Sequence, residues 1–145
     1  MDCPKCKAQM IVVEFEGVEL DHCVECGGTW FDRDELGLLF EDVGPAARAL
    51  LPLGAESLPE APAHEKRRRC PLCRKKMRKV LVGPAHDILI DVCPRGEGLW
   101  FDDAEVAELA DEVLAALPDA HGKAIEFMGR VMQGRKSSTE KKEGE

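Results

Sequence analysis

Residues 3–6 read CPKC, and residues 23–32 read CVECGGTWFD. The same pattern returns later in the chain, with CPLC at residues 70–73 and CPRGEGLWFD at residues 93–102. Two copies of one motif at this separation indicate a tandem repeat, in which each copy forms a small structural module. The fold therefore depends on what the paired cysteines of one module do.

The cysteine spacing of the first copy predicts a tetrahedral zinc site. A structural Zn²⁺ takes four ligands, and each bond to sulfur is about 2.3 Å long. Two Cys-x2-Cys turns, which we call knuckles, supply four thiolates when a hairpin brings them together. The chain has 7 cysteines, an odd number, and no long apolar run near its first residue. We therefore expect a reduced, cytoplasmic protein rather than an exported disulfide framework.

The second copy lacks the fourth thiolate, because Gly96 stands where the first copy has Cys26. Glu97 follows directly and is a candidate for the fourth position, since carboxylates bind zinc. A weakened or lost structural site is the competing interpretation. One zinc ion is thus predicted in the first module, and a second stays open. The predicted metal ligands are Cys3, Cys6, Cys23, Cys26, Cys70, Cys73, Cys93 and, as the candidate, Glu97.

Water or a histidine could also complete the second site. His86 precedes Cys93 by a predicted strand, which would place it roughly 20 Å away at the usual rise per residue. His64 and His121 are more distant in the sequence. Three protein ligands and an open position are also the arrangement of catalytic zinc. No obvious general base other than Glu97 stands beside this site, and we predict that the protein is not an enzyme.

Local patterns predict the same layout for both copies. Alternating apolar and polar residues predict strands at 10–15 and 18–22 in the first copy, and at 77–82 and 88–92 in the second. Glycine-containing turns separate the two strands of each pair. Each module is thus predicted to be a β-hairpin flanked by knuckles.

A helix is predicted to follow each hairpin. Asp32 and Asp102 are each followed three residues later by a glutamate, which is the spacing of a helix N-terminus. The apolar positions at helical spacing are Leu36, Leu39 and Phe40 in the first copy and Val106, Leu109, Val113 and Leu117 in the second. The Trp-Phe pairs at 30–31 and 100–101 are predicted to cover the metal site and to contact the helix.

The strings CPKC…DHCVECGGTWFDRDEL and CPLC…DVCPRGEGLWFDDAEV resemble the bacterial zinc-ribbon family that is named for the zinc finger of transcription factor IIB. The first copy matches at Cys3, Cys6, Met10, Asp21, Cys23, Cys26, Gly27, Gly28, Trp30, Asp32, Glu35 and Leu36. The second matches at Cys70, Cys73, Met77, Asp91, Cys93, Pro94, Gly98, Trp100, Asp102 and Glu105. The resemblance implies two zinc ribbons, the second degenerate, and says little about biochemical function.

These observations predict a small metal-stabilised α+β protein of two zinc-ribbon modules, with helices toward the C-terminus. Modules of about 40 residues usually need a metal to hold their fold. No segment is apolar for long enough to span a bilayer. The predicted boundaries are zinc ribbon 1 at 1–40, a linker at 41–65, zinc ribbon 2 with its helix at 66–117, an amphipathic helix at 118–134 and a disordered tail at 135–145.

Charge is distributed unevenly along the chain. The formal net charge is −8, yet residues 66–79 hold nine lysines and arginines and no acid. Such a run could be solvated, pair with the acidic first module, or bind an acidic protein face or a nucleic acid. The candidate partner-binding residues are Arg67, Arg68, Arg69, Arg74, Lys75 and Lys76.

Three function classes remain open. The first is a non-enzymatic zinc-binding interaction module that presents its ribbons to a partner. A protein is the favoured partner, and an association with transcription is one option. Nucleic-acid binding through residues 66–79 is the second. A thiol- or metal-handling protein that uses the three-cysteine site is the third. The sequence lacks a phosphate loop and an HExxH motif, in keeping with a non-enzymatic role. The oligomeric state is left open.

Overall fold

The computed structural model describes residues 1–117 except residues 16, 40–44, 53, 63–65 and 104. Phe40, His64, His121, the amphipathic helix predicted at 118–134 and the tail predicted at 135–145 therefore lie outside the described residues. None of the helices in the described part of the chain has the length and apolar character needed to cross a membrane.

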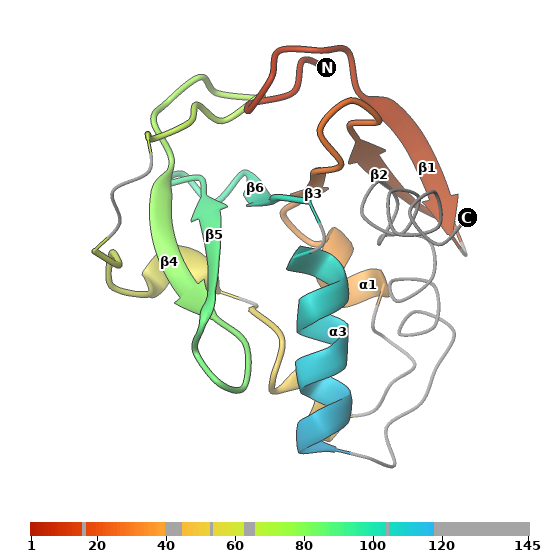
Figure 1. The fold of residues 1–145 in the computed structure, drawn as a ribbon, viewed down its shortest axis with the longest axis vertical. Coiled ribbons are helices and arrows are strands. Elements are labelled where there is room, and N and C mark those ends of the chain that lie inside the picture. The colour runs from red at the N-terminus through yellow and green to blue at the C-terminus, as the bar shows by residue number, and fades with distance from the viewer. Residues whose placement is uncertain (16, 40–44, 53, 63–65, 104, 118–145) are drawn as a thin grey trace, which may run out of the picture.

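The two copies form one antiparallel sheet of six strands, in the order β1-β2-β3-β6-β5-β4 (Figure 1). The strands are β1 (Ile11–Phe15), β2 (Val18–His22), β3 (Thr29–Asp32), β4 (Arg78–Val82), β5 (Ile88–Val92) and β6 (Gly98–Phe101). The helices are α1 (Glu35–Leu39), α2 (Pro45–Arg48), the 3₁₀ helix η2 (Ala55–Ser57) and α3 (Glu105–Ala116). An antiparallel sheet with helices beside it confirms the predicted α+β class.

The hairpins β1–β2 and β4–β5 lie where the alternation predicted them, within one residue at their starts. Each copy also has a third strand, β3 or β6, that the sequence patterns did not predict. These two strands pair with each other, and Trp30 lies directly opposite Trp100. The two halves are therefore joined edge to edge through backbone hydrogen bonds.

Successive side chains of a strand point to opposite faces of the sheet, and this alternation creates two cores. Phe31 and Phe101 lie on the helix side, where their rings meet edge to face with centroids 5.3 Å apart. The same core contains Leu36 of α1 and Leu109 of α3. The tryptophans lie in the other core, together with the cysteines. The helices thus contact the phenylalanines of the Trp-Phe pairs.

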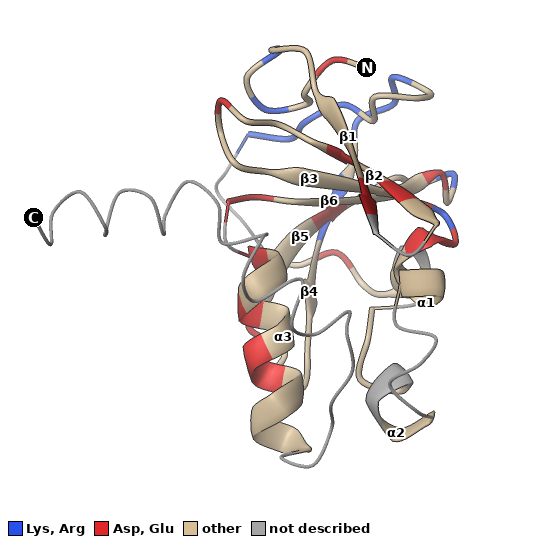
Figure 2. Cartoon of the chain, turned by 90° about the vertical axis from the view of Figure 1, so that its right-hand side faces the viewer, with Lys and Arg blue, Asp and Glu red and all other residues tan. Residues whose placement is uncertain are grey.

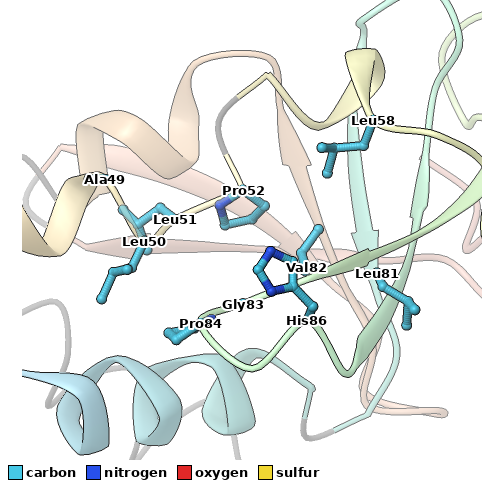
Figure 3. Close-up of a pocket in the computed structure, with 10 residues that line it drawn as sticks. All are labelled: Ala49, Leu50, Leu51, Pro52, Leu58, Leu81, Val82, Gly83, Pro84 and His86. Carbon is cyan, nitrogen blue, oxygen red and sulfur yellow. The ribbon is translucent and has the colours of Figure 1, made fainter.

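Part of the predicted linker packs against the second hairpin. Leu51 and Ala55 are buried in the helix-side core, and the N–H of Ala61 donates to the carbonyl of Lys79 at 2.7 Å. A cavity of about 280 Å³ lies between this segment and the turn after β4 (Figure 3). His86 lines it, exposed in that turn.

Candidate metal centre

The two knuckles of the first module bring four sulfur atoms together at one end of the sheet. The Sγ atoms of the four cysteines, Cys3, Cys6, Cys23 and Cys26, all lie within 4.8 Å of one another. Cys3 Sγ lies 3.6 Å from Cys26 Sγ, and Cys6 Sγ lies 3.4 Å from Cys23 Sγ. A tetrahedron with Zn–S bonds of 2.3 Å has edges of about 3.8 Å. The four thiols therefore fit one zinc ion with little rearrangement.

Backbone N–H groups of the knuckles point at the sulfurs. The N–H groups of Lys5 and Cys6 donate to Cys3 Sγ at 3.3 and 3.4 Å, and that of Cys26 donates to Cys23 Sγ at 3.5 Å. Burial raises the pKa of the Cys3 thiol. At Cys23 burial acts in the same direction, but hydrogen bonds from the Cys26 N–H and with Cys6 outweigh it, and the pKa is lowered. Such bonds favour the thiolate, which is the form that binds metal.

Three cysteines form the second cluster. The Sγ atoms of Cys70, Cys73 and Cys93 lie within 4.8 Å of one another, and Cys73 Sγ is 3.5 Å from Cys93 Sγ. The N–H groups of Leu72 and Cys73 donate to Cys70 Sγ at 3.4 Å, as their counterparts do in the first knuckle. Burial raises the pKa of the Cys70 thiol to about 12. These three sulfurs fit three of the four positions around zinc.

The turn that follows Cys93 differs from its counterpart. In the first copy the N–H of Gly27 donates to the carbonyl of Cys23, four residues back. In the second the N–H of Gly96 donates to the carbonyl of Cys93, only three residues back. Gly96 has a φ of 74°, in the left-handed region that favours glycine. The second copy has thus lost the thiolate and also adopted a tighter turn.

Glu97 is not among the side chains that the structure brings to the three-cysteine cluster. Its carbonyl accepts a hydrogen bond from the N–H of Arg33 at 3.0 Å, and Arg33 Nε donates to the carbonyl of Gly96 at 2.9 Å. Zinc ligation by Glu97 stays a prediction. His86 likewise lies outside the cluster, in the turn between β4 and β5.

The two cysteine clusters belong to a single buried core. Its members are Cys3, Met10, Cys23, Cys26, Trp30, Cys70, Met77, Cys93 and Trp100. Figure 1 shows the loop that contains Cys3 and Cys6 beside the loop that contains Cys70 and Cys73, at the end of the sheet that carries the N-terminus. The predicted role of the tryptophans as cover for the metal sites is thus consistent with their packing.

Two glycines that sequence reasoning did not single out for packing make this core possible. A Cβ at Gly28 would lie 2.2 Å from the ring of Trp100, and a Cβ at Gly98 would lie 2.5 Å from the ring of Trp30. Each tryptophan therefore rests on the glycine of the other copy. Both copies keep a glycine two residues before the tryptophan, and this repetition was the available signal.

The carboxylates after the tryptophans were predicted to cap the helices. Asp32 Oδ1 instead accepts a hydrogen bond from the Trp30 indole N–H at 2.8 Å, and α1 begins only at Glu35. Asp102 has the same relation to its tryptophan. The glutamate does reach back as predicted, because Glu35 Oε1 accepts from the N–H of Asp32 at 2.7 Å.

The basic run at 66–79 is divided by the fold. Lys79 is buried, and its Nζ lies 2.8 Å from Asp91 Oδ1 on the neighbouring strand. Arg68 is half-buried, 3.9 Å from both Asp91 and Asp102. Arg67 forms an ion pair with Glu60. Of the predicted partner-binding residues, those exposed are Arg67, Arg69, Arg74, Lys75 and Lys76.

Charges of opposite sign occupy different parts of the surface. Figure 2 shows Lys and Arg in the loops around the N-terminus, whereas the charged residues of α3 are all acidic. Lys5 and Lys7 of the first module are exposed, and Figure 1 shows their segment, residues 1–10, beside residues 66–77 of the second module. The end of the sheet that holds both cysteine clusters is thus the cationic end.

The chain is similar to a known protein family. The family model described as transcription factor zinc-finger matches residues 2–42 and 69–112, which together make up more than half of the chain. The two stretches contain the two cysteine clusters. No curated protein and no solved structure matches the chain.

Proposed function

The chain belongs to the transcription factor zinc-finger family, and from that premise we propose a non-enzymatic interaction module that binds an acidic protein face through its joined knuckles. The observation that carries the proposal is the single core shared by both cysteine clusters. That core makes two ribbons, each a hairpin with knuckles and a helix, into one rigid surface. Zinc at the first cluster supplies folding free energy to this surface.

The charge around the knuckles indicates the chemistry of the partner. Lys5, Lys7, Arg74, Lys75 and Lys76 are all exposed at this end of the molecule. The chain as a whole carries −8, which disfavours binding to a polyanion of unlimited length such as nucleic acid. A compact acidic face on a protein can meet the cationic end alone and avoid α3. The family description makes a transcription-associated protein the first class of partner to test.

The groups that resemble catalytic residues serve the fold. Strongly raised pKa values often mark active sites, and burial raises the pKa of Glu35 to about 7 and that of Glu105 to about 8. Both carboxylates accept the N–H of the aspartate that precedes their helix. Burial thus raises both pKa values, whereas the hydrogen bond from the aspartate N–H acts in the opposite direction. Because both carboxylates are engaged at helix starts, their raised pKa values have a structural cause, which supports a non-enzymatic module.

Affinity capture with two charge-reversed variants tests the proposal. The zinc-loaded full chain is compared with R74E/K75E/K76E, and with E108K/D111K on the exposed side of α3 as the matched control. We expect R74E/K75E/K76E, which we call the knuckle variant, and the chelated protein to lose the captured partner. The α3 variant, E108K/D111K, should keep it. Purified partner and bait must then bind directly, with an affinity that falls as salt rises.

Two outcomes would overturn this proposal. Retention of the same partner by the knuckle variant would show that the cationic end is not the binding surface. Loss of capture after nuclease treatment, with direct binding of duplex DNA or single-stranded RNA by the bait, would assign nucleic acid as the ligand.

A further inference from the structure

The second cysteine cluster departs from a closed zinc site in a way that suggests a separate activity. Three sulfurs converge, and the residue at the fourth position has no side chain. A Cβ built on Gly96 would meet nothing within 4 Å. The space beside Gly96, the position that Cys26 occupies in the first copy, is therefore open.

The loop that contains Gly96 and Glu97 is held in place by a residue of the first copy. Arg33 donates to the carbonyls of Gly96 and Glu97, through its Nε and its backbone N–H. The N–H of Gly96 donates a hydrogen bond to the carbonyl of Cys93. These contacts hold the backbone of Gly96 and Glu97, and the Glu97 carboxylate is not among the groups gathered at the cluster.

The surroundings of the two clusters differ in charge at matched positions. Around the second cluster lie five exposed cations: Arg69, Arg74, Lys75, Lys76 and Arg95. Their counterparts in the first copy are Asp2, Lys7, Ala8, Gln9 and Glu25, which have no net positive charge. Three thiolates and Zn²⁺ carry −1, and such a site amid five cations favours a further anionic ligand.

We propose that the second cluster binds zinc through Cys70, Cys73 and Cys93 and takes its fourth ligand from outside the chain, as an exogenous thiolate. Thiolate is the anionic ligand that matches the three already present, and zinc binds it well. An incoming thiol loses its proton to solvent as it becomes a ligand. The thiol comes from a small molecule such as glutathione or from a cysteine of another protein. This inference requires zinc binding but not the proposed acidic partner.

Cobalt substitution tests the inference directly, because the visible spectrum of Co²⁺ reports its thiolate ligands. The full chain is loaded with two equivalents of Co²⁺ and titrated with glutathione, with S-methyl glutathione as a control that keeps the charges and lacks the thiol. We expect a saturable spectral change with glutathione alone, and none in C73S/C93S. Removing three of the five cations around the cluster in R74Q/K75Q/K76Q should weaken glutathione binding about tenfold, which corresponds to the usual free energy of three exposed charge contacts.

Two further comparisons separate the alternatives. The variant E97Q should behave as wild type. C26G opens the first cluster, whose five matched positions carry no net positive charge, and it should bind glutathione more weakly than the native second cluster. A single-cysteine acidic peptide that binds more tightly than glutathione would assign the thiol to a protein, and the reverse order of affinities would assign it to a small molecule.

A cobalt spectrum that is altered by E97Q and insensitive to added thiol would assign the fourth position to Glu97 and overturn the inference. Failure to bind a second equivalent of metal would also overturn the inference.

Discussion

Replacing Gly98 with alanine should loosen the junction between the two halves of the sheet. The added Cβ would lie 2.3 Å from the carbonyl oxygen of Phe31 and 2.5 Å from the ring of Trp30. The Phe31 carbonyl belongs to β3, which is paired with β6, and Trp30 is fully buried. Neither contact can relax unless β3 and β6 move apart.

The cost follows from these contacts. Overpacking a well-packed core typically costs about 1–3 kcal/mol, and each ladder hydrogen bond lost as the strands separate adds about 1 kcal/mol. We expect a decrease of about 2–5 kcal/mol in the free energy of unfolding of the zinc-loaded protein. That is a large fraction of the roughly 5–15 kcal/mol that stabilises an ordinary domain.

Urea denaturation in excess zinc, followed by the near-ultraviolet circular dichroism of the tryptophans, measures this cost. The matched control is Gly96→Ala in the same loop, where the Cβ meets nothing within 4 Å. Its positive φ limits the control's cost to about 1–2 kcal/mol. If the two variants were equally destabilised, the packing of Trp30 on Gly98 would not be what joins the halves.

Three more substitutions follow from the structure. Lys79→Met removes the nearer of the two cations beside the buried Asp91 carboxylate and leaves Arg68, 3.9 Å away. It should cost about 3–5 kcal/mol in urea denaturation, and the double variant with Asp91→Asn should recover part of that cost. Glu105→Gln keeps the acceptor for the Asp102 N–H. Because burial raises the folded pKa of Glu105 from 4.5 to about 8, wild type should lose stability as the pH rises from about 4.5 to 8. The variant's advantage, up to a few kcal/mol, should therefore grow over that range and then level off. An advantage independent of pH would contradict this. Cys26→Ser should abolish tight zinc binding at the first cluster in a chelator competition, whereas unchanged affinity would show that a fourth thiolate is not needed.

Much of the metal centre could be predicted because its signals are local. Cys-x2-Cys spacing forces a tight turn whatever surrounds it, and a hairpin of alternating residues returns the chain to the same place. The four-cysteine cluster and the three-cysteine cluster are both present as predicted. The missing thiolate at Gly96 was also visible in the sequence.

The junction between the copies could not be predicted from such signals. Strand β3 has only four residues, and its partner β6 lies far along the chain. A short strand with a distant partner leaves no periodicity to read. The burial of Lys79 was missed for a similar reason, because the sequence pattern counted its charge as part of a basic run. Only the register of β4 on β5 places it opposite Asp91.

The central claim is that thiolate-bound zinc holds both halves in one fold around Trp30 and Trp100. Its most direct test is a zinc titration of the chelated, fully reduced chain, with the tryptophan near-ultraviolet signal and the bound zinc recorded together. We expect no tryptophan signal without zinc, and recovery of most of it as the first equivalent binds. A full tryptophan signal in the metal-free, reduced protein would show that zinc does not hold the two halves together.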